Sequence, residues 1–343
     1  GKRAEISTLN HLSTDLLEIG NESFLADSTS IGVPTVYLGT MYLRDTHIGD
    51  RSFIGNSAVL LPGSKIGNDC LIGVLSTAPV TDDENKINGS SWLGSPPIFL
   101  PKRQESPKFD EKLTFHPPWY LYIVRGSIEF FKITMPYTLA SWLIILFYEI
   151  ISPLTLTLGP IPLTLTAILL FSALCCSSML SGIFFKWVLI GHYKPTAKPL
   201  WSTFVWRNEF INSITECFVF PIYQNMMLGT PMAPFFFRLM GCKIGRNVYM
   251  ETTEITEFDL VHIQSDSAIN FGTTIQTHLF EDRVMKMSVV EIGKSCTVGA
   301  MSVVLYDSKM GDHSTLDGLS LLMKGEALPK CTKWMGSPSV RIN

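Results

Sequence analysis

An aliphatic residue returns every six positions along two separate stretches of the chain. An amphipathic helix repeats its apolar residues at intervals of three and four, and a half-buried strand alternates by two. A period of six is instead typical of a hexapeptide β-helix, in which each face of a triangular coil contributes one inward side chain. The repeated positions are Ile48, Ile54, Leu60, Ile66 and Ile72 in the earlier stretch, and Ile292, Val298, Val304, Met310 and Leu316 in the later one.

Gly, Asn or Asp follows many of these aliphatic residues, as in IGD at 48–50 and IGN at 54–56. A coil that turns a corner every six residues needs positive φ angles, which these three residue types tolerate best. A β-meander would instead show Asn-Gly turns between alternating strands. The sequence therefore predicts a mainly β chain with two short left-handed hexapeptide β-helices, over 1–100 and 238–343.

The two stretches are related by duplication, because one constant offset maps 48–72 onto 292–316. Nearly the same offset relates WLGSPPIFL (92–100) to WMGSPSVRI (334–342). If about eighteen residues form a coil, each copy has only about two to three coils, which is near the minimum for a stable solenoid. We therefore expect the copies to pack on each other or on the helices between them.

The two copies are expected to differ in one insertion. The second copy has nineteen residues between Phe271-Gly272 and Ile292, whereas the first has eight between Leu38-Gly39 and Ile48. This comparison predicts a polar loop over 273–291 in the second copy alone. The loop interrupts an otherwise regular solenoid, so it is the best candidate for a functional site.

The segment 133–185 contains one charged residue, Glu149. Two apolar stretches in it are long enough to cross about 30 Å of hydrocarbon, and a Pro- and Gly-rich turn at 152–162 separates them. We predict a transmembrane helical hairpin there, preceded by a linker and membrane-proximal segment at 101–132. Basic residues flank both outer ends, which places both β-helices on the cytosolic side. Glu149 either snorkels or hydrogen-bonds within the helices, or it is a functional intramembrane carboxylate.

The segment 186–237 is also apolar, but Glu209, Glu216 and Pro221 interrupt it. A third span would place the second β-helix on the opposite side of the membrane. We therefore expect interfacial or re-entrant helices here, with aromatic side chains at the headgroup boundary. The aromatic candidates are Trp201, Trp206 and Tyr223.

Composition adds further limits. Hydrophobic residues make up 46% of the chain and charged residues 17%, which indicates that part of it lies outside water. The net charge of −3 argues against a nucleic-acid partner. The seven cysteines form no CxxC or CxxH pair, so no metal site is predicted and reduced thiols are expected. The chain starts at Gly1, and we expect it to be part of a longer polypeptide.

Three segments carry a resemblance to a known family. KWVLIGHYKPTAKPLWS (186–202), RLMGCKIGRNVYME (238–251) and THLFEDRVMK (277–286) resemble the carboxy-terminal region of nonribosomal peptide synthetase-like proteins of the poly-amino-acid synthetase type. The resemblance implies that adenylation and carrier domains of the same longer chain load an amino acid as a phosphopantetheine thioester. It implies no directly bound cofactor, a lipid bilayer as a partner, and acyl transfer to an amine or hydroxyl. Homo-oligomers are a further possibility.

Hexapeptide acyltransferases use a histidine as general base, and His278 is the candidate because its loop interrupts the coils. We expect Glu281 or Asp282 to orient the imidazole, and Arg283, Thr277 and Lys286 to bind substrate. Another reading makes His278 a polar cap and its charged neighbours local salt bridges. His47, His262 and His313 are expected to be structural. Two other functions remain open: a non-catalytic membrane anchor that docks the synthetase domains, and export of product.

Overall fold

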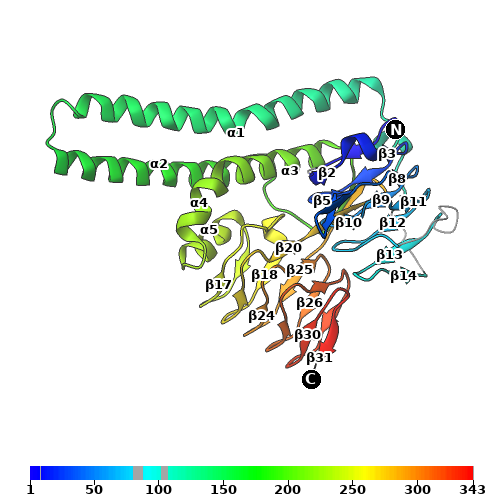
Figure 1. Ribbon diagram of the computed structural model, residues 1–343. Helices are drawn as coiled ribbons and strands as arrows, with labels where there is room; N and C mark the ends of the chain where they lie inside the picture. Colours follow the sequence, from blue (N-terminus) through cyan, green and yellow to red (C-terminus); the bar gives the residue numbers. More distant parts are fainter. Residues whose placement is uncertain (8, 80–87, 102–106, 343) are drawn as a thin grey trace.

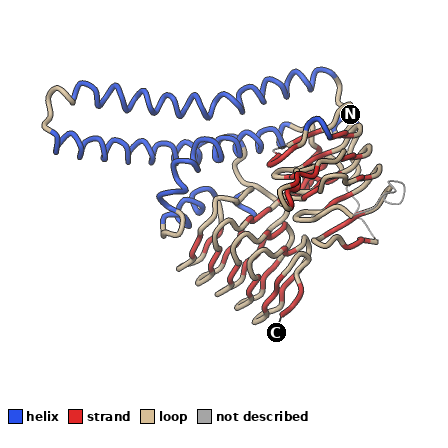
Figure 2. The backbone as a smooth tube through the Cα atoms, viewed as in Figure 1, coloured by secondary structure: helices blue, strands red, loops and turns tan. Residues whose placement is uncertain are grey.

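The computed structural model describes residues 1–7, 9–79, 88–101 and 107–342. Two β-helices flank two long apolar helices in the sequence, which confirms the predicted fold class. Figure 1 shows the helices as a paired layer, with both β-helices gathered on one side of it and toward one end. The coil strands of each β-helix stack in successive layers, as the tube in Figure 2 shows.

The first β-helix stacks its coils in parallel register. Ile48 pairs with Ile66 and Ile54 with Ile72, so eighteen residues form one coil. The inward aliphatic residues at 48, 54, 60, 66 and 72 are all fully buried. The strands are β1 (Glu5–Ile6), β2 (Leu9–Leu12), β3 (Leu17–Ile19), β4 (Phe24–Leu25), β5 (Thr29–Ile31), β6 (Thr35–Tyr37), β7 (Thr40–Tyr42), β8 (Thr46–Ile48), β9 (Phe53–Ile54), β10 (Val59–Leu60), β11 (Lys65–Ile66), β12 (Leu71–Ile72), β13 (Ser91–Leu93) and β14 (Ile98–Leu100).

The second β-helix repeats this arrangement. Ile292 pairs with Met310 and Val298 with Leu316, again eighteen residues apart. Its strands are β16 (Lys243–Ile244), β17 (Tyr249–Met250), β18 (Val261–Ile263), β19 (Ala268–Ile269), β20 (Thr274–Gln276), β21 (His278–Glu281), β22 (Val284–Met287), β23 (Val290–Ile292), β24 (Thr297–Val298), β25 (Val303–Leu305), β26 (Lys309–Met310), β27 (Thr315–Leu316), β28 (Leu321–Leu322), β29 (Ala327–Leu328), β30 (Lys333–Met335) and β31 (Val340–Ile342).

The prediction that only the second copy carries an insertion was wrong. Ile19 pairs with Ile48 and Ile263 with Ile292, so one coil in each copy spans 29 positions instead of eighteen. Each long coil carries a β-hairpin, β6–β7 in the first copy and β21–β22 in the second. Leu38 and Gly39, which mimic a repeat position in the sequence, form the turn of the first hairpin, with φ angles of 49° and 75°.

The segment 273–291 is thus built of strands and is not an irregular loop. β21 and β22 pair antiparallel, and β15 (Thr196–Pro199), from the connection after the second long helix, adds to β22 as a third strand. All four residues of β22 are buried. The equivalent β6–β7 hairpin is exposed and apolar, including Leu38 at its turn.

The two long helices extend beyond the predicted apolar segment. α1 (Trp119–Leu154) starts within the expected linker, and α2 (Pro160–Leu189) follows after a short turn. Both are long and apolar enough to cross a membrane. The first turns of α1 are fastened to the β-rich part, since Arg125 contacts Glu5 at 3.1 Å. Residues 102–106 of the predicted linker lie outside the described residues.

Four shorter helical elements fill 203–240. They are α3 (Thr203–Ile214), the π-helical turn η4 (Thr215–Val219), α4 (Phe220–Met227) and α5 (Met232–Met240). Pro221 does not end this helical run. It is the second residue of α4 and comes directly after the wider π-helical turn η4, where its lack of an N–H group is tolerated. The predicted headgroup positions of Trp201 and Trp206 were wrong, because both are buried in the protein core, whereas the Tyr223 side chain lies outside the described part.

The two copies pack on each other, as predicted, although the second β-helix is longer than the expected two to three coils, since five of its strands (β16, β18, β23, β26 and β29) stack on one face. Val74 and Leu93 of the first β-helix share a buried cluster with Leu279 and Leu321 of the second. The closing hairpins also meet, since a Cβ added at Gly94 would lie 2.7 Å from the Ser337 carbonyl oxygen. This contact requires a glycine. The hairpin β21–β22 therefore lies at the junction of both β-helices.

Candidate active site

His278 is the first residue of β21, where the chain leaves the solenoid to form the hairpin. Its Nδ1 atom lies 2.7 Å from Oε2 of Glu257. The Glu257 side chain is fully buried, whereas the imidazole retains 13% exposure. A histidine held through one ring nitrogen by a buried carboxylate has its tautomer fixed, and the other nitrogen remains available for proton transfer.

Glu257 is itself held by several donors. The Thr277 hydroxyl donates to Oε2 at 2.6 Å, and the Asn208 amide donates to Oε1 at 2.7 Å. The Tyr193 hydroxyl donates to the Asn208 side-chain oxygen at 2.6 Å. These contacts join the second β-helix, α3 and the connection after α2. They hold the carboxylate in the protein interior, where an unpaired charge would reduce the free energy of unfolding.

The electrostatics of the pair favour an imidazole that binds a proton readily. Burial would lower the pKa of His278, but the Glu257 carboxylate outweighs burial, so the pKa rises above its usual 6.5. Burial would likewise raise the pKa of Glu257, whereas His278, Thr277 and Asn208 lower it overall. Glu257 is therefore ionised at neutral pH, and His278 holds its proton to a higher pH than an ordinary histidine.

Further carboxylates interact electrostatically with His278 or with one another. Glu216 of η4 is exposed to solvent, but partial desolvation by the surrounding protein and the charges of Glu254 and Asp27 raise its pKa to about 7. Burial and Asp27 also raise the pKa of Glu254. Asp27 comes from the first β-helix, so three separate parts of the chain meet here. The charges of His278 and of Lys132 act in the opposite direction on Glu216. Besides Glu257, the charges of Asp27 and Glu209 act on the imidazole and favour its protonated form.

Glu281 and Asp282 do not orient His278, contrary to the expectation from sequence. His278 is at the base of the hairpin opposite Met287, whereas Glu281 is beside the turn and opposite Val284. Side chains alternate across a strand. Phe280 accordingly shares the face of His278, with ring centroids 5.5 Å apart. Asp282 is in the turn itself, at a φ of 51°.

Glu281 instead belongs to a buried ionic cluster with Lys286 and Lys324. Lys286 Nζ lies 2.8 Å from Glu281 Oε2, and Lys324 contacts Oε1. Burial would raise the pKa of Glu281, but the two lysines lower it overall. Lys286, predicted to bind substrate, thus has a structural partner.

Arg283 is turned into the protein. Its guanidinium donates to the carbonyl oxygens of Thr114 and Arg3 and lies over the Phe115 ring, 5.1 Å from the centroid. It joins the hairpin turn to the amino terminus and the linker. Of the three residues predicted to bind substrate, Thr277 lies beside His278, where its hydroxyl donates a hydrogen bond to Glu257.

The first copy lacks this pair. Aligning the two hairpins by their strand register places Pro34 at the position of His278 and Ser13 at that of Glu257. Ser13 donates to the Gly32 carbonyl oxygen instead. The described chain therefore holds one such His–Glu pair at this corner of its two β-helices.

Sequence reasoning missed Glu257. A signal was available: the six-residue period fails between Met250 and Ile263, which are thirteen positions apart. The irregular segment ETTEITEFDL (251–260) contains both Glu254 and Glu257. Asn208 and Tyr193 had no comparable signal, because only the tertiary fold brings α3 to the β-helix.

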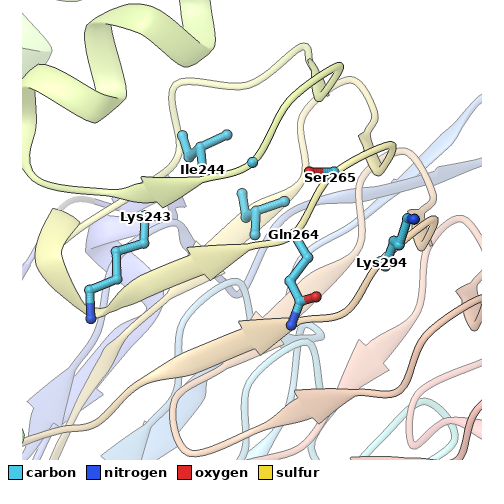
Figure 3. Close-up of a pocket in the computed structure, with 7 residues that line it drawn as sticks. Lys243, Ile244, Gln264, Ser265 and Lys294 are labelled. Atoms are coloured by element: carbon cyan, nitrogen blue, oxygen red, sulfur yellow. The ribbon is translucent and has the colours of Figure 1, made fainter.

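A separate groove opens at a different corner of the second β-helix. Figure 3 shows it between the turns that follow β16, β18 and β23. His278 lies at the corner after β20, so the groove and the His–Glu pair are distinct. The groove is lined by Lys243, Ile244, Gly245, Ile263, Gln264, Ser265 and Lys294.

Comparison with known proteins agrees with the repeat pattern. Residues 45–77 match the family described as bacterial transferase hexapeptide (six repeats). Among solved structures, soybean serine acetyltransferase covers 50% of this chain and 57% of its own, with a TM-score of 0.28 and 14% identity. A maltose O-acetyltransferase from Clostridium difficile 630 covers 35% and 79%, with a TM-score of 0.26 and 15% identity. The fold assignment rests on the strand register described above.

A curated relative matches nearly the whole chain. The chain is 40% identical over 344 residues to delta-poly-L-ornithine synthetase of Acinetobacter baumannii (strain AB307-0294). The match covers 99% of this chain and 25% of that protein, so the chain spans about a quarter of the relative's length. The resemblance predicted from the sequence is thereby confirmed: this is a hexapeptide-repeat chain similar over almost its full length to part of a poly-amino-acid synthetase.

Proposed function

We propose that the chain is the acyl-transfer region of a larger synthetase and joins a carrier-bound aminoacyl thioester to an amine. The observation that supports this most directly is the 2.7 Å contact between His278 Nδ1 and the buried Glu257 carboxylate. A general base for this reaction needs a pKa near the working pH and a fixed tautomer. The buried carboxylate fixes the tautomer and raises the pKa of His278 above its usual 6.5.

The reaction balances without a further reactant. The neutral amine nitrogen attacks the thioester carbonyl carbon, and His278 Nε2 accepts a proton from that nitrogen. The C–N bond forms in this attack and gives a tetrahedral intermediate, which collapses as the C–S bond breaks. The leaving thiolate then takes the proton from the imidazolium. Glu257 stabilises the imidazolium while it carries the proton.

We further propose that the acceptor carries a second, protonated amine. Glu216, Glu254 and Asp27 act on one another electrostatically beside His278, and such a group of carboxylates favours a cation. The synthetase that this chain resembles is named for poly-L-ornithine, and ornithine has two amines. One amine reacts as a neutral nucleophile at His278 while the carboxylates hold the other as a cation.

The first β-helix has a different role in this proposal. Pro34 and Ser13 occupy the positions of the catalytic pair, and the first β-helix contributes Asp27 to the carboxylates near His278. It supports the hairpin through the stacking of Phe24 on Phe280, at a centroid distance of 5.8 Å. We propose that α1 and α2 cross the membrane, with both β-helices on the cytosolic side, where the carrier domain delivers the thioester.

The test is His278→Ala in the complete synthetase, with amide product measured after loading of the carrier. We expect product formation to fall by about 10²-fold or more, with normal carrier loading. His47→Ala is the matched control, because His47 also contacts a carboxylate, Glu18 at 2.9 Å, but is 40% exposed. If His278→Ala forms a normal amount of product, the catalytic function is rejected and the function of a non-catalytic membrane anchor remains.

A further inference from the structure

We propose that the outer face of α5 lies in the headgroup region of the same lipid bilayer that α1 and α2 cross. The inference rests on the proposed membrane crossing and is independent of the chemistry at His278. It concerns a helix of nine residues, Met232–Met240, which precedes the second β-helix directly. Its two faces are both apolar, and only one of them is covered by protein.

The inner face belongs to the core. Ala233, Phe236, Phe237 and Met240 are fully buried, and Phe237 packs toward Phe258 of the second β-helix with ring centroids 6.2 Å apart. These contacts fix the rotation of the helix about its axis. The helix therefore cannot rotate to bury the side chains of its opposite face.

The outer face carries Met232, Phe235 and Leu239, which are 45%, 50% and 39% exposed. Their spacing of three and four residues forms one stripe along the helix. A helix on the surface of a soluble domain normally presents polar residues there, and a contiguous exposed apolar stripe indicates a protein or membrane contact. Arg238 is the polar neighbour of this stripe.

The stripe is continuous with the apolar surface of α2. The Trp187 indole of α2 donates to the Leu239 carbonyl oxygen at 2.9 Å, which joins the two helices. Phe184 and Val188 of the same part of α2 are 60% and 63% exposed. Figure 1 shows α4 and α5 beside the helical pair, which extends well past them toward the α1–α2 turn. A bilayer that surrounds the far part of the pair would thus reach α5.

The charges at the end of α5 fit a lipid surface. Lys243 and Arg246 are exposed just beyond the end of α5, and Tyr249 follows at 42% exposure, with its hydroxyl bonded to Glu251. The Arg238 guanidinium donates to the Ile244 and Gly245 carbonyl oxygens and holds this segment against the helix. Lys and Arg near an apolar stripe are attracted to anionic headgroups, and Tyr is enriched at the boundary between lipid and water. A protein partner would account for the apolar stripe but not for its continuity with the lipid-facing surface of α2.

The test measures depth in the bilayer at single positions. Cys176, Cys217 and Cys331, which are exposed, are replaced by Ser, and Phe235→Cys is labelled with an environment-sensitive fluorophore. The protein is reconstituted into vesicles of phosphatidylcholine and phosphatidylglycerol that carry a spin label near the headgroup or deep in the acyl chain. We expect the shallow label to quench position 235 most strongly, by at least about threefold more than a solvent-exposed control.

Two control positions separate the possible outcomes. Leu319→Cys, 74% exposed on a late coil of the second β-helix, is expected to resist both quenchers. Leu146→Cys in α1 is expected to respond to the deep label. If position 146 responds while 235 behaves like 319, the α5 inference is overturned. If 235 shows an apolar environment without lipid quenching, a protein covers the stripe and the inference is also overturned. Failure at position 146 would reject the membrane crossing itself.

Discussion

His278 and Glu257 come from different coils of the second β-helix, yet their side chains meet at 2.7 Å. The hairpin supplies the imidazole, and the irregular segment before β18 supplies the carboxylate. In the first copy the same two positions hold Pro34 and Ser13. The duplication thus conserved the coil and the hairpin, whereas the pair that can move a proton occurs in one copy.

Glu257→Gln tests the role of the carboxylate without removing its shape. The amide still accepts a hydrogen bond from Nδ1–H, but it does not stabilise an imidazolium by charge. We expect kcat for product formation by the complete synthetase to fall by about 10²-fold. Glu291→Gln is the control, because Glu291 is a partly exposed carboxylate that pairs with Lys309 at 2.7 Å. Equal effects of the two variants would contradict a specific role for Glu257.

The pH dependence of the reaction follows from the raised pKa of His278. The base is active when neutral, so kcat/KM should rise with pH through a midpoint above 6.5. In Glu257→Gln the largest charge that raises the pKa of His278 is lost, while burial, which lowers it, and the weaker charges of Asp27 and Glu209 remain. The midpoint of the residual activity should therefore move to lower pH. A midpoint that stays fixed, measured from pH 5 to 9, would show that another group controls the rate.

Glu281→Ala tests the structural alternative for the residues at the hairpin turn. Removing Glu281 leaves the charges of Lys286 and Lys324 together in a buried site. We expect a loss of about 3 to 5 kcal/mol in the free energy of unfolding, measured in detergent with denaturant. Glu291→Ala, which breaks a partly exposed pair, should cost less than about 1 kcal/mol.

The pH dependence of this loss has a defined sign. The pKa of Glu281 in the folded protein is below its ordinary value of 4.5. Its contribution is thus present above pH 4.5 and disappears as the pH falls through the folded-state pKa. The stability difference between Glu281→Ala and the parent should shrink in acid. A difference that is independent of pH would exclude the ionic cause.

The regular part of the fold could be predicted from sequence because each inward aliphatic residue has a fixed place in the eighteen-residue coil. Ile48 over Ile66 and Ile292 over Met310 follow directly from the spacing. The hairpins were harder, since Leu38-Gly39 imitates a repeat position while it forms a turn. Local sequence does not distinguish a glycine that turns a coil from one that turns a hairpin.

The candidate site was predictable in part. His278 lies in the segment that departs from the six-residue repeat, and this departure is the signal that predicted it as a site residue. Its partner was wrongly assigned to Glu281 or Asp282 because a loop was assumed, and strand alternation then placed Glu281 on the opposite face. Glu257 is twenty-one positions earlier, and Asn208 is on a separate helix. Such long-range contacts depend on tertiary packing that no local pattern encodes.

The acidic surroundings of His278 predict how an acceptor binds. We expect the double variant Glu216→Gln and Glu254→Gln to raise KM for a diamine acceptor about three- to tenfold, with kcat within about twofold. An acceptor with one amine, neutral when it attacks, should be unaffected. Because the pKa of Glu216 is about 7, binding of the cation should strengthen as the pH rises through 7 in the parent and not in the variant. If both acceptors lose activity equally, the carboxylates support the site without recognising the cation.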